Sequence, residues 1–588
     1  MDLQIQMMLE QQILIKNPFD SGFLSPIFLV PKGDGSQRPI FNLKRLNQFL
    51  GLKKFHLMNH LRLPDFLQRG DFLVKIDLSQ AYCHVPIRPS HQRFLSLAYR
   101  DNIYCMTCLP FGLASAPQIF AKLTNWVAGY LRSLGLRVVV YLDDFLLVNQ
   151  DSECLQAQAQ VAVQTLQLLG WTVNFEKSQL SPTQCCQYLG IVWNPSTDLK
   201  FLPLEKQMVI HRYLLSVLQS RHWSWRIAKV IMGYLSFAGF VIPLGKLHYR
   251  QIQWGSRRLS RSQPHRLVAI PKLALSQIQW WTSALHRSSP IFPRSPQVFV
   301  TSDASDVGWG VVVNDRMHKD FWTDAQKEWH INLKELFAVR RALELNVPLL
   351  QNKVVLVQSD NRTVIAYIHR EGGTKSLRLL QEVEALFSVA VTHNMVLIAR
   401  FIPGRYNTWA DNLSRQKCLP DWHLLPGATS EIFRHWGVPE IDLFATVNSA
   451  VVPQYVALSA QDHQAQFVDA FSQTWNFALA WIFPPPPLLP RVLNHLNSAR
   501  GLFILIAPCW ENVFWRPDLE ARAVAPPMYV KKLKENLIDL SSGRPPPEVS
   551  SLSLQARLVR GGSSKFRDGN SLTCLTSIFS VQLGVNQP

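Results

Sequence analysis

The sequence predicts an α/β protein that is divided into several domains. The chain has 588 residues, whereas one compact domain usually holds about 100–200 residues. Hydrophobic residues make up 47% of the chain, which is enough for several cores. Short apolar runs of strand length alternate with longer stretches of helical periodicity, and this alternation is typical of α/β domains.

Changes in pattern along the chain predict five segments. Residues 1–200 are dense in short apolar runs separated by Pro and Gly, whereas residues 201–290 have a helical pattern rich in Trp, Leu and basic residues. Residues 293–416 alternate strand-like runs such as VFVTSD and KVVLVQSD with helical stretches, so we expect one compact α/β domain there. Residues 417–530 form a third region. Residues 531–588 include stretches rich in Ser, Gly and Pro, which predict a disordered tail.

The charge of the chain indicates a polyanionic partner. The 60 Lys and Arg residues outnumber the 41 Asp and Glu residues, which gives a net charge of +19. Nucleic acid is the simplest partner for such an excess of positive charge. The strongly basic stretch at residues 250–266 either faces a phosphate backbone or forms a solvated linker.

We expect an intracellular protein, cytoplasmic and/or nuclear, that is not secreted. The first residues lack the basic start, apolar run and cleavage site of a secretory leader. No run of about 20 apolar residues is present, so no membrane span or membrane partner is expected. The nine cysteines follow no regular framework, which indicates reduced thiols.

Two adjacent acids, Asp143 and Asp144, lie between two apolar runs in RVVVYLDDFLLV (residues 137–148). This pattern predicts two β-strands joined by a tight turn at the acids. Adjacent carboxylates repel each other, and a bound divalent cation would relieve that repulsion. An acidic hairpin turn without a metal is the alternative, because Asp is common in turns.

A third acid, Asp77, ends another apolar strand in VKIDLSQAY. If the strands are neighbours, Asp77 and Asp143 can share two metal ions, which stabilise the attacking and leaving oxygens in phosphoryl transfer. Magnesium suits such hard oxygen ligands. The three acids together therefore favour a metal-dependent site over a simple turn.

Several motifs follow one another in the order found in reverse transcriptases. They are PIFLVPKGDGSQRPIFNLKRLN (26–47), Asp77-x-x-x-Ala81-Tyr82, LPFGLASAPQIF (109–120), Tyr141-Leu142-Asp143-Asp144, GWTVNFEKSQL (170–180) and QYLGIVW (187–193). Through them, roughly residues 20–250 resemble the polymerase of that family. The resemblance implies a right-hand polymerase with fingers and a ferredoxin-like palm in residues 1–200, followed by a thumb or connection in residues 201–290.

The same resemblance assigns roles to individual residues. Asp77 and Asp143 would be the main catalytic ligands of two Mg²⁺ ions, with Mn²⁺ as a possible substitute, and Asp144 would be a supporting carboxylate. Tyr82 matches the bulky gate below the sugar that excludes a 2′-hydroxyl; without the motif it would be interpreted as a core aromatic. Lys177 matches a lysine proposed to protonate pyrophosphate.

The fingers and the following loop carry the remaining nucleotide-binding positions. Lys32 and Arg38 match basic residues that hold the incoming triphosphate, although either could be an ordinary surface charge. Gly112 and Pro117 would shape the loop around template and nucleotide. Phe111 stands where retroviral enzymes usually carry Gln, and elements of the gypsy and DIRS types carry Phe there. The resemblance therefore points to a retrotransposon.

A second set of acids lies in residues 293–416. Asp303 and Asp360 end apolar strands, and Asp411 lies where a helix is expected to start. Glu335 lies in a helical stretch, with the small residues Ala338 and Ala342 on its own face, so that it can approach a sheet closely. Each acid alone would be interpreted as a turn or a helix cap.

Together, the order strand-Asp, helix-Glu, strand-Asp and helix-Asp resembles ribonuclease H. The resemblance implies that Asp303, Glu335, Asp360 and Asp411 are catalytic ligands of two Mg²⁺ ions, at which a metal-activated water attacks an RNA phosphodiester. There is one departure from the family: many of these enzymes carry a histidine in the loop before the last Asp. Here the loop reads FIPGRYNTWAD, with Arg405 near the expected place.

Residues 417–530 resemble the region that follows ribonuclease H in DIRS-type retrotransposons. That region has been likened to an adenine methyltransferase, but the sequence shows no convincing glycine-rich cofactor loop. We therefore expect an accessory α/β region and assign it no activity. The chain also lacks a recognisable recombinase motif set.

The expected function is RNA-directed DNA polymerase with ribonuclease H. The expected partners are an RNA template, a DNA primer, an RNA–DNA hybrid and deoxynucleoside triphosphates; protein partners are not indicated. The alternative is an inactive or truncated transposon remnant that binds nucleic acid without catalysis. A third interpretation, an RNA-copying RNA polymerase, is disfavoured by Tyr82 and by the fused ribonuclease H-like domain.

Overall fold

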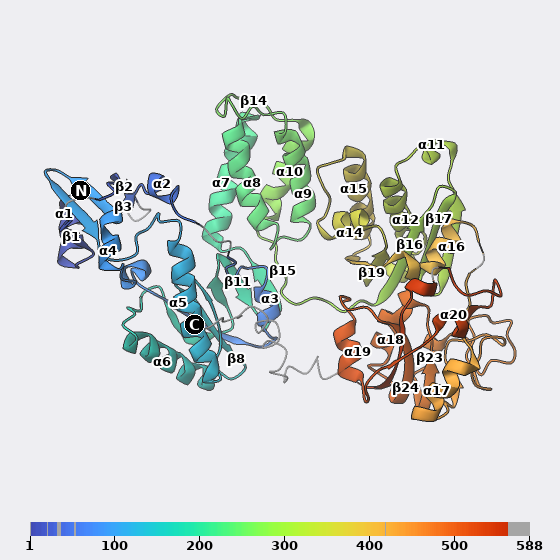
Figure 1. Ribbon diagram of the computed structural model, residues 1–588. Helices are drawn as coiled ribbons and strands as arrows, with labels where there is room; N and C mark the ends of the chain where they lie inside the picture. The colour runs from blue at the N-terminus through green and yellow to red at the C-terminus, as the bar shows by residue number, and fades with distance from the viewer. Residues whose placement is uncertain are drawn as a thin grey trace. The chain divides into compact units, whose positions relative to one another are not determined.

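The computed structural model describes residues 2–19, 22–31, 37–51, 55–417, 419–547 and 549–562 (Figure 1). The chain forms two compact units and passes from one to the other three times. The first unit comprises Met1–Gly245 and Arg258–Pro293, and the second comprises Lys246–Arg257 and Arg294–Pro588. None of the described helices combines the length and the apolar character needed to cross a membrane.

An antiparallel sheet of four strands lies at the centre of the first unit. Its order is β7 (Arg137–Tyr141), β8 (Asp144–Asn149), β4 (Phe72–Asp77) and β9 (Gln179–Thr183). Val74 and Ile76 of β4 share one core with Phe145 and Leu147 of β8, because alternate residues of a strand face the same side. Residues of α5 (Ala116–Ser133) and α6 (Ser152–Leu168) complete that core.

Smaller sheets and short helices surround this centre. They are α1 (Asp2–Glu10), the sheet β1 (Leu14–Lys16), β6 (Asn102–Met106) and β5 (Ser96–Tyr99), the hairpin β2 (Ile27–Pro31) and β3 (Gln37–Phe41), the short helix η1 (Ala81–His84), and the strands β10 (Cys186–Tyr188), β11 (Ile191–Asn194), β12 (Leu199–Phe201) and β15 (Ser289–Pro290). The first unit therefore mixes α and β structure, as the dense Pro and Gly punctuation predicts.

Residues 201–290 are mainly helical. Their long helices are α7 (Leu204–Ser220), α8 (Trp225–Ala238), α9 (Gly245–Ser256) and α10 (Lys272–Ala284). Helix α9 differs from the expected assignment, because residues 246–257 belong to the second unit. The Leu247 amide donates to Glu371 over 3.2 Å, and Gln251 donates to Glu384 over 2.8 Å. The first part of the basic stretch is therefore a packed helix, not a solvated linker.

The second unit begins with a mixed sheet of five strands. Its order is β18 (Arg316–Phe321), β17 (Gly308–Val313), β16 (Val298–Ala304), β19 (Val354–Ser359) and β20 (Val396–Phe401). Strands β16, β19 and β20 are parallel, whereas β17 and β18 are antiparallel to their neighbours. Every residue of β19 is buried, as expected for a central parallel strand. The helices of this part are α12 (Ile331–Leu345), α14 (Arg362–His369), α15 (Leu377–Thr392) and α16 (Thr408–Ser414).

A second sheet of five strands follows in the same unit. Its order is β22 (Ile441–Asp442), β23 (Asn476–Ile482), β24 (Arg500–Pro508), β27 (Leu554–Arg560) and β25 (Met528–Tyr529). Its main helices are α17 (Pro426–Trp436), α18 (Leu489–His495) and α19 (Arg516–Arg522). Strands β22, β23 and β24 are parallel, and β27 is antiparallel to β24.

The prediction of a disordered tail from residue 531 is wrong for the described residues 531–547 and 549–562. Strand β27 pairs with β24 along its whole length, from Leu502↔Arg560 to Pro508↔Leu554. Strand β27 lies between β24 and β25 in the sheet, and the apolar residues of LQARLVR are buried there. The Ser- and Pro-rich residues on either side dominate the composition and conceal this short strand. Residues 563–588 lie outside the described residues.

Candidate active sites

The first three predicted acids meet at one end of the antiparallel sheet. In the ladder between β4 and β8, Asp77 lies opposite Asp144. Asp143 lies in the turn between β7 and β8, where Tyr141 is the register partner of Asp144. The Leu78 amide donates to the Asp143 carbonyl over 3.2 Å, which fixes the turn against β4. The register partner of Asp77 across the ladder is thus Asp144, and the charge of Asp143 also reaches Asp77.

The turn that carries Asp143 is strained. Leu142 has a φ of +53°, a left-handed conformation in which a branched residue such as Leu is rarely found. Such a residue costs about 1–3 kcal/mol, and strain of this kind is concentrated at functional sites. Tyr141 and Asp144, which lie on either side of the Leu142–Asp143 turn, are register partners in the ladder and hold the turn in this conformation.

Charge is concentrated among these acids. Burial, and after it the charge of the neighbouring Asp144, raise the pKa of Asp77 to about 6. Burial also raises the pKa of Asp143, while the positive charges of Lys75 and Lys177 lower it. Lys75 forms an ion pair with Asp144 at 3.3 Å. The oxygen that faces Lys75 is Asp144 Oδ1, which is buried and has no hydrogen-bond partner, so a bound cation would compete with Lys75 for it.

Tyr82 follows these acids in η1 and packs against two aromatic rings. Its ring centroid lies 4.7 Å from that of Phe111 and 5.0 Å from that of Phe120. Burial raises the pKa of the Tyr82 hydroxyl, and the nearby Asp143 raises it further. Tyr82 is therefore a fixed side chain next to the acids, and Phe111 is part of its support.

Gly112 is required by close backbone packing. It has a φ of +99°, and a Cβ at this position would lie 2.8 Å from the Phe41 carbonyl oxygen. Asn47 bridges the same loop, since its amide nitrogen donates to the Gly112 carbonyl over 2.9 Å and its oxygen accepts from Ala114 N over 2.8 Å. The loop is thus held against the end of β3, which is the fingers hairpin in the sequence interpretation.

The other predicted nucleotide-binding residues are located less completely. Lys32 lies outside the described residues. Arg38 lies in β3 opposite Val30, and only its backbone is described. Lys177 is exposed, and its amide donates to Asn174 over 3.3 Å. Pro117 lies in the first turn of α5, where its missing N–H costs nothing.

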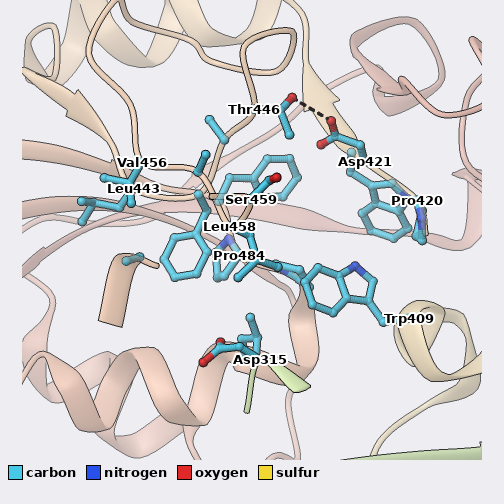
Figure 2. A pocket seen from close by; sticks show the side chains of 18 of the residues that line it. Asp315, Trp409, Pro420, Asp421, Leu443, Thr446, Val456, Leu458, Ser459 and Pro484 are labelled. Carbon is cyan, nitrogen blue, oxygen red and sulfur yellow. Dashed lines mark hydrogen bonds between the residues drawn. The ribbon is translucent and has the colours of Figure 1, made fainter. Parts of the chain in front are cut away.

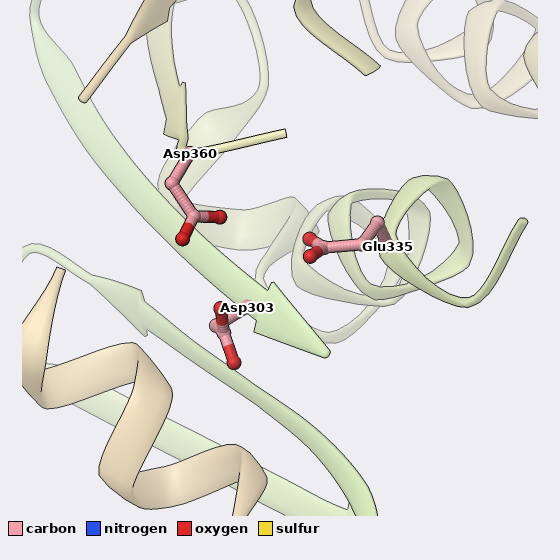
Figure 3. Close-up of side chains that lie close together, drawn as sticks. All are labelled: Asp303, Glu335 and Asp360. Carbon is pink, nitrogen blue, oxygen red and sulfur yellow. The ribbon is translucent and has the colours of Figure 1, made fainter. Parts of the chain in front are cut away.

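Three of the four acids of the second set converge in the second unit (Figure 3). Asp303 comes from β16, Glu335 from α12, and Asp360 directly follows β19. One oxygen of each carboxylate lies within 4.8 Å of the other two. The predicted small-residue face of α12 lies against the core, since Ala338 and Ala342 are fully buried.

Burial makes these three acids hard to ionise. It raises the pKa of Glu335 to about 9, with further contributions from Asp303 and Asp360. It raises the pKa of Asp303 to about 7 and also raises that of Asp360. One Glu335 oxygen, Oε2, is buried without a hydrogen-bond partner. Three carboxylates with an unsatisfied oxygen are a donor set that fits a hard divalent cation.

Asp411 lies near this group but is engaged elsewhere. It accepts a hydrogen bond from Arg415 Nε at 2.8 Å, and it is not among the three acids that meet. Its negative charge nevertheless raises the pKa of Asp303 and of Asp360. Arg415 would therefore compete with a shared ion for Asp411 Oδ1.

Helix α16, which carries Asp411, packs directly onto the sheet. A Cβ at Gly310 of β17 would lie 2.5 Å from Leu413 Cβ and 2.6 Å from the Ala410 carbonyl oxygen. The hydroxyl of Ser414 donates to Asp303 Oδ2 over 2.6 Å. Sequence reasoning missed both Gly310 and Ser414; the only signal was the Gly-x-Gly pattern inside a predicted strand, which indicates close approach of another backbone.

The loop before Asp411 also contacts the acids. A Cβ at Gly404 would lie 2.7 Å from Asp360 Oδ2, so this loop covers Asp360. Arg405, which stands near the place where a histidine was expected, instead donates to the Ser551 carbonyl over 2.9 Å. The structure thus directs the Arg405 side chain to the C-terminal segment that was expected to be disordered.

The region that carries the first set of acids matches a known protein family. Residues 30–193 match a family model described as reverse transcriptase (RNA-dependent DNA polymerase). The chain is 27% identical over 176 residues to Protein P of a duck hepatitis B virus, covering 29% of this chain and 21% of that protein. It is 25% identical over 183 residues to the Pro-Pol polyprotein of simian foamy virus type 1, covering 31% of this chain and 15% of that protein. The match therefore spans only about a fifth of the length of Protein P.

Among solved structures, the chain is similar to a foamy viral protease-reverse transcriptase in complex with double-stranded DNA. The TM-score is 0.44 at 19% identity, over 68% of this chain and 81% of that chain. The same viral protein in complex with an RNA/DNA hybrid gives a TM-score of 0.44, over 68% of this chain and 53% of that chain. On the family match and the viral relatives, the chain contains a reverse transcriptase domain that is homologous to viral polymerases.

Proposed function

We propose that the chain is an RNA-directed DNA polymerase with a fused ribonuclease H, encoded by a DIRS-type retrotransposon. The polymerase part of this proposal rests on one observation: the first set of acids lies within the residues that match the reverse transcriptase family model. Residues 30–193 contain Asp77, Asp143 and Asp144, and the β4–β8 ladder brings these acids together. The element type is supported by Phe111 and by the order of motifs along the chain.

At the polymerase site, Asp77, Asp143 and Asp144 would hold magnesium. The bound ions would stabilise the attacking and leaving oxygens of nucleotidyl transfer. Tyr82, fixed between Phe111 and Phe120, would lie below the sugar and exclude a 2′-hydroxyl. Lys177, an exposed residue whose charge reaches Asp143, would give a proton to the departing pyrophosphate.

At the second site, Asp303, Glu335 and Asp360 would hold magnesium, and Asp411 would join them. The bound ions would activate water for attack on an RNA phosphodiester. The strand order and the helices that carry these acids support a ribonuclease H-like fold for this part of the second unit. Ser414 orients Asp303 through its hydrogen bond, which leaves the other oxygen of Asp303 for a ligand.

The test is primer extension on an RNA template with deoxynucleotides and Mg²⁺, with the RNA labelled in the same tube. Asp143→Asn should abolish extension and leave RNA cleavage unchanged, whereas Asp360→Asn should do the reverse. The exposed acids Asp101 and Glu328 provide matched controls, because Asp101→Asn and Glu328→Gln remove a charge away from both sites. A folded wild-type chain that performs neither reaction would support a nucleic-acid-binding remnant instead.

A further inference from the structure

The connection between β20 and α16, residues 402–407, is bonded directly to segments that carry the second set of acids. Asn407 is fully buried, and its side-chain amide donates to the carbonyl of Ser302 over 3.0 Å. Ser302 directly precedes Asp303 in β16. The backbone amide of Asp411 donates to the Asn407 carbonyl over 3.0 Å, so the same residue fixes the first turn of α16. Asn407 thus joins two acid-bearing segments that lie far apart in the sequence.

Other residues of this connection are embedded in the C-terminal region, which is the part of the second unit that follows α16. Ile402 and Tyr406 belong to the same hydrophobic core as the apolar residues of β23, β24 and β27. The Tyr406 ring meets the Trp510 ring edge-on, with 4.4 Å between the centroids, an arrangement that aromatic pairs favour. The Arg405 guanidinium donates to the Ser551 carbonyl over 2.9 Å. The connection therefore depends on partners outside the sheet that carries the acids.

Two further elements near the acids also contact the C-terminal region. Trp409, in the first turn of α16, lines a cavity together with Pro420 and Pro484 (Figure 2). In β19, the strand that leads into the third acid of the set, the Gln358 side chain is buried and donates to the Pro487 carbonyl over 2.9 Å. A buried donor without a partner is costly, so this bond holds the two segments together. The C-terminal region thus contacts the connection, α16 and β19.

We propose that the C-terminal region is a scaffold for the second set of acids. It holds residues 402–407 in place, and Asn407 acts as the positioning residue that passes this hold to Asp303 and Asp411. This role requires no ligand and no reaction in the C-terminal region itself. The effect on catalysis rests on the proposed ribonuclease H activity, whereas the hold is a property of the protein alone, so the two can be tested separately.

The hold is measured first, on the full chain with a metal chelator and without nucleic acid. Trp510→Ala removes the ring against Tyr406 and leaves every acid in place. Amide hydrogen exchange of residues 402–412, which reports local opening, should become at least about 10-fold faster in this variant. Trp510→Phe keeps a ring and should restore most of the protection. Arg405→Ala removes the bond to Ser551 without opening the core, so it should accelerate the same exchange by a smaller factor even if Trp510→Ala does not fold.

A matched variant separates the hold from a general loss of stability. Phe433 packs edge-on against Trp481 in the same core, with 5.5 Å between the ring centroids. Phe433→Ala should therefore lower the melting temperature of the protein, yet leave the exchange of residues 402–412 close to that of the wild type.

The consequence is measured by RNA cleavage with Mg²⁺. Trp510→Ala and Asn407→Ala should lower kcat by about 10- to 100-fold, because a displacement of about 1 Å at catalytic groups can cost about 10²-fold, while KM for the hybrid and the rate of primer extension stay unchanged. Unchanged exchange in Trp510→Ala, exchange that rises equally in Phe433→Ala, or faster exchange with an unchanged kcat would overturn the proposal. A folded wild-type chain that does not cleave RNA would refute the nuclease assignment, and the exchange measurements would then decide the scaffold by themselves.

Discussion

The packing of helix α16 on Gly310 makes the second acid site sensitive to one added methyl group. In Gly310→Ala the new Cβ would lie 2.5 Å from Leu413 Cβ and from Ser414 N, whereas ordinary contact begins at 3.4 Å. The helix or the strand must therefore move by about 0.9 Å (3.4 − 2.5). Overpacking of this kind costs about 1–3 kcal/mol. A displacement of about 1 Å at catalytic groups can lower the rate by about 10²-fold.

We therefore expect Gly310→Ala to lower ribonuclease H activity by about 10²-fold and to leave primer extension unchanged, since the polymerase acids lie in the other unit. The free energy of unfolding, measured by denaturant titration followed at the second unit, should fall by about 1–3 kcal/mol. Gly233→Ala is the control, because a Cβ there meets nothing within 4 Å. Unchanged cleavage together with unchanged stability would refute the argument. If Gly310→Ala loses stability but the wild-type chain does not cleave RNA either, the packing argument stands and only the assigned activity is refuted.

Three further changes test the electrostatics. Lys75→Met removes the 3.3 Å ion pair with Asp144, so the acidic limb of the primer-extension pH profile should move to higher pH; an unmoved limb would contradict this. Arg415→Ala releases Asp411 from its 2.8 Å hydrogen bond, so half-maximal RNA cleavage should need several-fold less Mg²⁺, measured by metal titration with Arg434→Ala as the control. Asp442 is fully buried with a pKa raised to about 7, so its stabilising contribution is present below pH 3.8 and is lost as the pH rises through 7. Asp442→Asn loses a buried hydrogen bond to the backbone that is worth about 1–3 kcal/mol, so the variant should melt at a lower temperature than the wild type. This difference in melting temperature should shrink between pH 5.5 and 8.5, and a constant difference would contradict the assignment.

Local pattern was sufficient to predict the secondary structure around the acids. The run RVVVYLDDFLLV predicts a hairpin, and the structure has β7 and β8 with Asp143 in the turn. It was not sufficient to give the register, because the position of one strand against another depends on packing of the whole sheet. The ladder pairs Asp77 with Asp144, a relation between residues far apart in the sequence.

Composition was a poor guide at the end of the chain. The Ser- and Pro-rich residues near 541–553 predict disorder, yet Arg405 donates to Ser551, and β27 completes the second sheet. A strand of seven residues can be decisive for a fold while contributing little to an average over 58 residues. The constraint at Gly310 is invisible for a related reason: it depends on a helix about 100 residues later, and no local pattern encodes that contact.

The two sets of acids should respond differently to pH, because their surroundings differ. Lys75 lies beside the first set of acids, and the pKa of Asp77 is raised only to about 6, so Asp77 is mostly ionised at neutral pH. Among the described residues, no ion pair reaches Glu335, and its pKa is raised to about 9.

Magnesium must therefore displace a proton from Glu335 below pH 9, and metal affinity falls when a ligand must first lose a proton. Between pH 7 and 9, the Mg²⁺ concentration for half-maximal RNA cleavage should fall by up to about 10-fold per pH unit, while that for primer extension should change little. Metal titrations of both activities on the same preparation measure this, with Glu328→Gln as a control for a remote acid. Equal pH dependence of the two activities would mean that burial does not control the ionisation of Glu335.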